Sequence, residues 1–278
     1  MKATRFLGVL LAAGIGIYCA SVVTDAEAAP PPKKEAAPSV APFPPMTTRP
    51  ITLSFPGIVF GMPPEKVASA IDGIIDNDYK AKYKDVSPGV NMRALDAEVA
   101  EAKSQFRRSR IDFGKLPTGV DASPLRGEYS YNNQETMMTL ARNGENIEFF
   151  FIQNRLWKMI GEHHLAESSS YGKDFQTAVT KFASLYGVAG RLLQPDNTSR
   201  FAVEVDWKDA ANHLRIIQRS DTLIGVALED IGTWQALPSL RPNKPTADNG
   251  IDPSVAAAMR KEEAPPGPPE KKPPPKKK

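Results

Sequence analysis

The distribution of proline limits what this chain can fold into more than any other feature of the sequence. Of its 26 prolines, eight lie in residues 29–50 and eleven in residues 238–278. Segments so rich in proline and so poor in aromatic residues cannot bury enough apolar surface to offset the entropy lost on ordering. The sequence therefore predicts a folded region over residues 51–237, between a disordered Pro-rich linker (29–50) and a disordered Pro/Lys-rich tail (238–278).

Charge follows the same division. The formal net charge is +3, but it comes from the two proline-rich ends, because residues 51–237 contain slightly more acidic than basic side chains. A nucleic-acid-binding domain needs a basic face on its folded part, so we expect no nucleic-acid partner. The tail either only solubilises the protein or contacts anionic lipid or acidic cell-wall polymer. The candidate residues for such contacts are Lys271, Lys272, Lys276, Lys277 and Lys278.

The start of the chain has the order of a secretory signal peptide. Lys2 and Arg5 precede an apolar run over residues 6–23, and an Ala-x-Ala sequence follows at residues 26–28. This order predicts a signal that is removed on export, so we expect residues 1–28 to be cleaved and the mature protein to reside in a bacterial periplasm. The alternative is an uncleaved inner-membrane anchor through the same apolar run, whose length is at the lower limit for a spanning helix.

The single cysteine, Cys19, lies within this segment. A lipoprotein is cleaved just before a lipidated cysteine that follows a small residue, whereas Tyr18 precedes Cys19 here, so a lipoprotein is not expected. Cleavage after Ala28 leaves a mature chain without cysteine. An exported fold without disulfides has to be stabilised by its hydrophobic core.

Hydrophobic periodicity indicates helices in the first part of the folded region. Residues 51–60 are β-branched and apolar, which predicts a strand interrupted near Pro56-Gly57. Pro63 and Pro64 then begin a helix, in the first turn of which a missing N–H costs nothing. A loop over residues 80–90 and a second helix over residues 92–110 follow.

After residue 127 the pattern changes to alternation, which predicts strands. The first four strands are expected over residues 128–133, 136–142, 146–152 and 155–163, with turns at Asn143-Gly144-Glu145 and Gln153-Asn154. A helix over residues 173–186, ending at Gly187, separates them from three more strands over residues 201–207, 213–219 and 223–229.

A weak internal repeat relates the two parts. Shifting the chain by 76 residues places the second helix and its strands on the third helix and its strands, in matched order. The predicted fold class is α+β, with two tandem modules, each a helix followed by an antiparallel meander of three or four strands. The first module covers residues 51–167 and the second covers residues 168–237.

Two local phrases carry a resemblance to known proteins. Phe151–Lys158 and Val205–Ile216 have the order typical of those proteins, which is strand, tight polar turn and strand, with a tryptophan that closes one strand before a hairpin. In these phrases and in its element order, the region 58–230 resembles the α/β modules of periplasmic proteins of the β-lactamase-inhibitor kind. That group includes the accessory lipoprotein of the outer-membrane β-barrel assembly machine. The resemblance implies a non-catalytic protein that presents a sheet face or a helix pair to other proteins.

No sequence pattern indicates catalysis or metal binding. The chain lacks a G-x-S-x-G elbow and a glycine-rich phosphate loop. His163 and His164 are neighbours on a predicted strand and so point to opposite faces, and His213 stands alone, so none of them suggests a metal site. We therefore expect no catalytic residue, no metal and no cofactor. A hydrolase with catalytic acids far apart in the sequence is the remaining enzymatic alternative.

Four aromatic residues are candidates for an interaction surface: Tyr129, Tyr131, Trp157 and Trp207. They alternate along predicted strands, and such a stripe is more often sheet core than binding platform, unless one sheet face is uncovered. The leading hypothesis is an exported, non-enzymatic envelope protein that acts as a protein–protein interaction or assembly factor with an envelope protein as partner. The alternative is a periplasmic small-ligand or glycan-binding protein that uses these aromatics.

Overall fold

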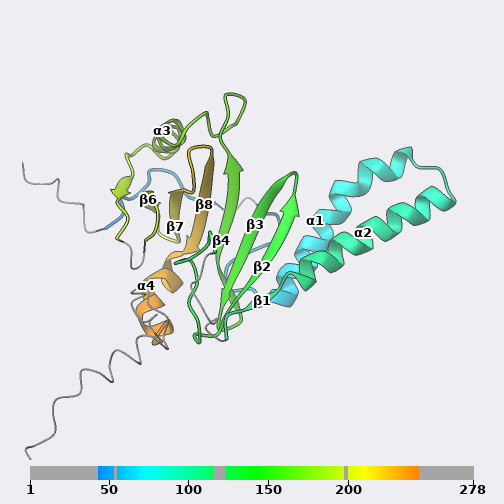
Figure 1. Ribbon diagram of the computed structural model, residues 1–278, viewed down its shortest axis with the longest axis horizontal. Helices are drawn as coiled ribbons and strands as arrows, with labels where there is room; N and C mark the ends of the chain where they lie inside the picture. The colour runs from blue at the N-terminus through cyan, green and yellow to red at the C-terminus, as the bar shows by residue number, and fades with distance from the viewer. Residues whose placement is uncertain (1–42, 53–54, 115–122, 197–199, 244–278) are drawn as a thin grey trace, which may run out of the picture. The chain divides into compact units, whose positions relative to one another are not determined.

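The computed structural model of the chain describes residues 43–52, 55–114, 123–196 and 200–243. Within these ranges the helices are α1 (Pro64–Asp85), α2 (Val90–Arg108), α3 (Phe175–Tyr186) and α4 (Ile231–Leu240). The strands are β1 (Ile111–Asp112), β2 (Glu135–Arg142), β3 (Glu145–Ile152), β4 (Arg155–His164), β5 (Arg191–Leu193), β6 (Glu204–Lys208), β7 (Asn212–Gln218) and β8 (Leu223–Asp230). The fold is α+β, as predicted (Figure 1).

The described strands form one eight-stranded sheet in the order β1-β2-β3-β4-β8-β7-β6-β5, and every neighbouring pair is antiparallel. In the middle of the sheet β4 pairs with β8, with Met159 opposite Leu228. The strands on either side of residue 167, where the sequence analysis divides the chain into modules, therefore belong to the same sheet. From the centre of the sheet outward, one half runs β4, β3, β2, β1 and the other half runs β8, β7, β6, β5. Each half therefore places its strands in reverse chain order.

Two tight turns join the first three long strands, and both were predicted. Asn143 (φ 54°) and Gly144 (φ 78°) connect β2 to β3, and Gln153 (φ 49°) and Asn154 (φ 63°) connect β3 to β4. Two successive residues with positive φ are the geometry of the hairpin turn whose twist matches the strands. These turns fix the register of β2, β3 and β4.

One face of the sheet is covered by α1, α2 and α3. The helices α1 and α2 bury Val67, Ile71 and Phe106 against Phe149 and Phe151 of β3. The other half of the same face packs on α3, which covers a second cluster. That cluster includes Ala178, Val205, Trp207, Leu214 and Ile216. The amphipathic pattern of the predicted helices is confirmed, because their apolar stripes are the faces that contact the sheet.

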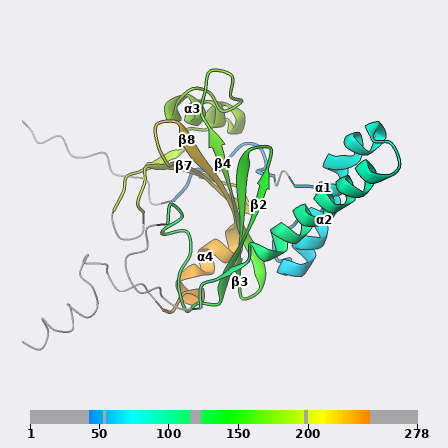
Figure 2. The same cartoon turned by 45° about the vertical axis from the view of Figure 1, so that its right-hand side comes forward.

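The opposite face is covered by α4 and by the irregular segment 123–134. Phe150, Ile160 and Ala227 of the sheet are buried there, with Leu237 and Leu240 of α4 packed against them. Figure 2 shows α4 crossing this side of the sheet, below β7 and β8. Both faces of the sheet are therefore inside the folded unit.

The strand predicted over residues 51–60 is wrong for the residues that are described, although the interruption predicted near Pro56-Gly57 is present as a turn. Phe55 and Gly57 belong to a turn, with φ 78° at Gly57. Ile51 and Ile58 are each only 2% exposed. The apolar pattern of this segment therefore reflects loop side chains that fill the core, which alternation alone does not distinguish from a strand.

The strand predicted over residues 128–133 is also wrong. Asn132 (φ 59°) and Gln134 (φ 57°) have left-handed backbone conformations, which interrupt an extended chain. The side chain of Asn133 bonds to Ser130 and to the carbonyl of Asn243 instead of facing a neighbouring strand. Local side-chain bonds of this kind compete with sheet formation.

Two element boundaries differ from the prediction. The helix α1 continues through the predicted loop to Asp85, and α4 lies across the boundary at which the tail was expected to begin. Pro238 lies inside α4. None of the helices in the described ranges is long and apolar enough to cross a membrane, and residues 6–23 are outside those ranges.

Candidate functional site

The two tryptophans predicted for an interaction surface are core residues. Trp157 is 1% exposed and Trp207 is 0% exposed, and they lie in clusters on opposite faces of the sheet. Trp207 donates a hydrogen bond from Nε1 to the carbonyl of Val188 at 3.0 Å. The structure therefore corrects the prediction for the two tryptophans, because helices and loops cover both faces of the sheet. The tryptophans belong to the core of the sheet, which is the more common role of such an aromatic stripe.

The two tyrosines lie together, on the same face as Trp157. The ring of Tyr129 stacks on Phe113 with 3.9 Å between centroids, and Tyr131 meets both rings edge-on at 5.6 and 5.8 Å. Tyr129 and Tyr131 are half-buried. This aromatic group fastens the irregular segment 123–134 onto the sheet.

The remaining predicted residues give no site. The tail lysines Lys271, Lys272, Lys276, Lys277 and Lys278 lie outside the described residues. Of the histidine pair, His163 stacks on Tyr171 at 4.2 Å and lies 3.0 Å from Glu145, whereas His164 is exposed. One packed and one solvent-facing histidine is the arrangement expected from their adjacent strand positions.

A group of buried charges, which the sequence analysis missed, lies on the sheet face under α4. We call it the charge network. Its members are Glu128, Lys158, Glu204, Asp206, His213, Arg215 and Glu229. The signal was present in the sequence as alternation: Glu204 and Asp206 flank the core residue Val205 at two-residue spacing. Alternation places both carboxylates on the face opposite Val205.

His213 is at one end of the network and is 1% exposed. Its Nδ1 lies 2.6 Å from Glu229 and its Nε2 lies 3.2 Å from Asp206. Trp234 of α4 covers the ring with 4.2 Å between centroids. Burial alone would lower the pKa of His213, but the two carboxylates outweigh burial and raise the pKa above its ordinary value.

Arg215 is the centre of the network. Its guanidinium pairs with Glu128 at 2.5 Å, with Glu229 at 2.7 Å and with Glu204 at 3.1 Å. Burial opposes ionisation of Glu229, yet Arg215 and then His213 lower the pKa of this carboxyl to about 2. Burial likewise opposes ionisation of Glu128, and Arg215 and Lys158 hold its pKa far below the usual range.

Lys158 completes the network from β4. Its ammonium pairs with a carboxylate oxygen of Glu128 at 2.9 Å and also bonds to the carbonyl of Glu128. The same ammonium lies over the rings of Phe150 and Trp157 at 4.4 and 4.6 Å. Burial is the main reason why the pKa of Lys158 is lowered, partly offset by Glu128.

These contacts make the charge network a structural framework. The segment 123–134 contributes Glu128, the sheet contributes the cations, and α4 closes the network with Trp234. Buried charges are tolerated only when they are paired and hydrogen-bonded, which is the situation here. None of the network residues lines either of the two cavities described below. The network therefore fixes the covering elements on the sheet.

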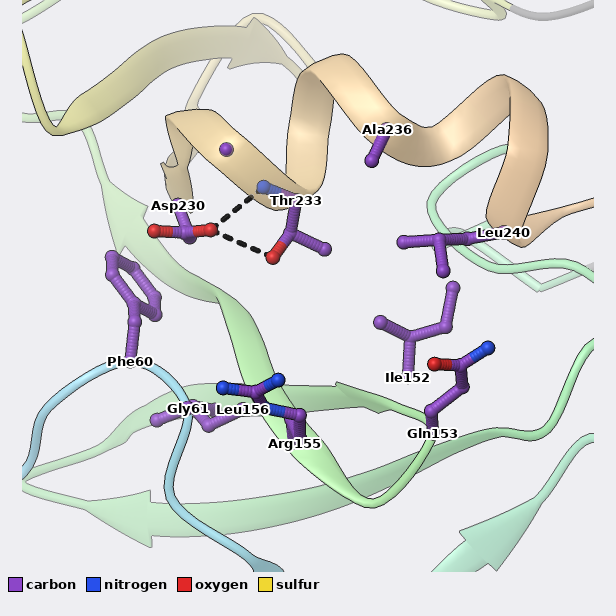
Figure 3. A pocket seen from close by; sticks show the side chains of 11 residues that line it. Phe60, Gly61, Ile152, Gln153, Arg155, Leu156, Asp230, Thr233, Ala236 and Leu240 are labelled. Carbon is purple, nitrogen blue, oxygen red and sulfur yellow. Dashed lines mark hydrogen bonds between the residues drawn. The ribbon is translucent and has the colours of Figure 1, made fainter.

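A cavity of about 360 Å³ lies beside the N-terminus of α4 (Figure 3). Asp230 closes its upper side and accepts hydrogen bonds from Thr233 through the backbone N–H at 2.7 Å and the hydroxyl at 2.6 Å. Asp230 is thus committed to capping the helix. Arg155 stands at the opposite wall and makes no ion pair with any described residue. One uncommitted guanidinium beside the apolar side chains of Ile152 and Leu240 can hold an anion, but it defines no reaction.

The end of the α1–α2 hairpin is the most exposed described structure. Figures 1 and 2 show that it extends beyond the sheet. No residue of α1 after Ile75 and no residue of α2 before Leu95 is buried. We call residues 79–94 the arm. Its helices are held to each other by side chains, and Tyr79 and Tyr83 at its base also pack, partly buried, against the core cluster.

Three cross-helix hydrogen bonds hold the base of the arm. The hydroxyl of Tyr79 and the ammonium of Lys82 both bond to Glu98, at 2.9 and 3.0 Å. The hydroxyl of Tyr83 bonds to Asp96 at 2.8 Å. The paired helices therefore present a defined outer surface.

Comparisons with protein families, with curated protein sequences and with solved structures each found no match for this chain. The resemblance to periplasmic modules accordingly stays a prediction, and function has to be argued from the geometry.

Proposed function

We propose that the protein is an exported, non-enzymatic envelope protein that acts as an interaction or assembly factor. In this proposal the arm binds an acidic surface of an envelope protein. One observation carries the proposal: the arm is an ordered helical extension in which no residue is fully buried, and only Tyr79 and Tyr83 at its base pack against the core. A sheet stabilised by its own clusters does not need such an extension.

The stiffness of the arm supports a binding role. The cross-helix bonds at Glu98 and Asp96 hold the two helices of the arm against each other. A surface that is already ordered loses less conformational entropy when it binds. The arm is therefore suited to recognising a partner without refolding.

The charges of the arm indicate an acidic partner. Lys80, Lys84 and Arg93 are exposed and make no ion pair with a described residue, whereas Asp85 is the only exposed acid between them in the sequence. Val90, at the start of α2, is 74% exposed and offers an apolar contact next to these cations. A cationic surface around one apolar side chain favours an acidic partner and speeds its approach.

The predicted signal over residues 1–28 and the absence of a catalytic pattern in the sequence support the envelope and non-enzymatic parts of the proposal. Ligand binding by the sheet aromatics, the alternative from the sequence, is not favoured because Trp157 and Trp207 are buried. The charge network supports a structural role, because its carboxylates and cations are paired with one another.

Site-specific photocrosslinking in the host envelope tests the proposal. A crosslinking residue at position 84, in the arm, is compared with one at position 173, where Lys173 is 60% exposed beside α3. We expect position 84 to crosslink to one or two envelope proteins, and we expect position 173 to give no such product. Charge reversal by Lys80→Glu with Arg93→Glu should abolish the crosslink.

Equal crosslinking from both positions would contradict the proposal. A crosslink from position 84 that is unaffected by charge reversal would contradict the choice of an acidic partner. Circular dichroism of the charge-reversed variant should remain unchanged, because neither substituted side chain makes a contact that holds the arm.

A further inference from the structure

A second cavity, of about 520 Å³, lies at the edge of the sheet beside β1. We call it the polar groove. Its lining comes from the end of α2, from β1, and from two turns at residues 132–134 and 153–154. The lining side chains are polar and include no aromatic ring, which distinguishes this groove from the cavity beside α4.

Four side-chain amides project from the two turns that line the groove: Asn132, Gln134, Gln153 and Asn154. None of these side chains makes a hydrogen bond to another described residue. The turns are tied together by the N–H of Gln153, which donates to the carbonyl of Gln134 at 3.0 Å. This backbone hydrogen bond holds the two turns together, so that the four side-chain amides, each with donors and an acceptor, lie along one cavity.

The backbone of these four residues is strained. Asn132, Gln134, Gln153 and Asn154 have φ values of 59°, 57°, 49° and 63°. Asparagine adopts this conformation fairly often, but glutamine has no such preference, and glycine would adopt it at no cost. The hairpin between β3 and β4 requires this conformation at residues 153 and 154, and the chain supplies it with amide side chains where glycine would serve.

Thr136 supplies an independent observation. It lines the groove, is 8% exposed, and its hydroxyl oxygen is buried without a hydrogen-bond partner. A buried hydroxyl left unpaired is costly, and few occur in native proteins. A ligand, or a water bound with it, would give this hydroxyl a partner.

One cation and one anion, Arg110 and Asp112, line the groove, and Arg110 also pairs with Glu65 at 3.6 Å. Arg110 and Asp112 are two apart at β1, so their side chains lie on the same face of the strand. An anionic or cationic ligand would gain little from such a pair. A neutral ligand with many hydroxyl groups would gain most, because each amide offers both donors and an acceptor.

We propose that the polar groove binds a short neutral saccharide. The volume falls in the range of small-ligand sites, and the polar groups converge on it from four segments of the chain. The groove uses none of the arm residues, so this site and the proposed partner-binding function can fail independently. The recognition is by hydrogen bonds from side-chain amides, with no aromatic stacking.

Nuclear magnetic resonance titration of the full chain tests the site. The probes are maltotriose and the trimer of N-acetylglucosamine, and the readout is the side-chain amide signals of the four groove residues. We expect these signals to shift with one of the two saccharides. Two variants, Thr136→Val and Gln153→Gly, should each weaken binding about tenfold, the loss expected for roughly one hydrogen bond.

The same variants separate a binding role from a structural one. Val is isosteric with Thr and removes the unpaired hydroxyl, and Gly relieves the positive φ, so both variants should melt at the wild-type temperature or higher. Asn143→Gly is the matched control, since Asn143 has φ 54° in a turn that does not line the groove. It should leave binding unchanged.

Three outcomes would overturn the inference. The first is no shift of the groove amides with either saccharide up to about 10 mM, beyond which affinity is negligible. The second is wild-type affinity in both Thr136→Val and Gln153→Gly. The third is a shift of the same amides by the zwitterionic dipeptide Ala-Ala but not by a saccharide, which would make the ligand charged rather than neutral.

Discussion

His213 and Glu229 are register partners on β7 and β8, and Nδ1 of the histidine lies 2.6 Å from a carboxylate oxygen of the glutamate. The backbone pairing of two neighbouring strands thus sets the distance between two buried charges. Asp206, across β7 on β6, approaches the other ring nitrogen at 3.2 Å. The sheet therefore holds the imidazole between two carboxylates before α4 covers it.

Replacing this imidazole should destabilise the protein in a pH-dependent way. The pKa of His213 is raised on folding by Asp206 and Glu229, which outweigh burial. Its contribution is therefore fully present below pH about 6.5 and is lost as the pH rises through the folded pKa. We expect His213→Gln to lower the free energy of unfolding by about 3 kcal/mol at pH 6, as for a broken buried ion pair, and by less at pH 9. Urea unfolding at both pH values measures this, and an equal deficit at both would refute it.

The buried carboxyl of Glu148 should destabilise the protein at alkaline pH. Glu148 on β3 is 4% exposed, and burial, together with the nearby Glu162, raises its pKa to about 7. The folded state therefore favours the neutral acid, so stability falls as the pH rises from about 4.5 to 7. We expect Glu148→Gln to be more stable than wild type at pH 8, by up to about 3 kcal/mol, with little difference at pH 4.5. The control Glu65→Gln, at a side chain 71% exposed, should change stability little at either pH.

Two glycine substitutions should have opposite effects. A Cβ at Gly190 would come closer than 3.0 Å to Val205 and to the ring of Trp207. Gly190→Ala should therefore lower the free energy of unfolding by about 2 kcal/mol through overpacking. Gly73 lies in α1 with open space around it, so Gly73→Ala should raise the free energy by about 0.5–1 kcal/mol through helix propensity. Chemical denaturation of both variants checks the pair, and a neutral Gly190→Ala would show that the ring can move.

Removal of the α4 cap should loosen the cover of the charge network. Asp230→Ala deletes the acceptor of both Thr233 bonds, a loss of about 1 kcal/mol for an N-cap. Because Trp234 of α4 lies on His213, we expect its fluorescence to shift to longer wavelength and the α4 amides to exchange faster. Asp174→Ala removes the cap of α3 and is the matched control. It should cost a similar amount without the change at Trp234.

The parts of the fold that follow from local physics were predictable. The turns at Asn143-Gly144 and Gln153-Asn154 were read from residues that tolerate positive φ, and α3 ends at Gly187 in the left-handed conformation, as expected. The long strands were located within a few residues. In each case the backbone conformation that a residue prefers, or the alternation of buried and exposed positions along the chain, decides the local structure.

The errors arose where tertiary contacts override local preference. Residues 128–133 alternate like a strand, but Glu128 is drawn to Arg215, 87 residues later, and the segment follows that ion pair across the sheet. The helix α4 crosses the boundary at residue 238, where the density of proline indicated that the tail begins. Its cap at Asp230 and its packing of Leu237 hold it in place.

The sequence by itself determined the α+β class, the hairpin turns and the amphipathic faces of the helices, because periodicity and turn chemistry are properties of neighbouring residues. Only the tertiary structure decided that β4 pairs with β8. That pairing sets Lys158 beside Glu229 and brings the charges of β6, β7 and β8 onto one covered face. The tertiary structure also decided that Trp157 and Trp207 are core residues and that the cations of the arm and the amides of the polar groove stay uncommitted. The physical reason is that burial depends on which distant segment covers a face, and strand order, not local pattern, selects that segment.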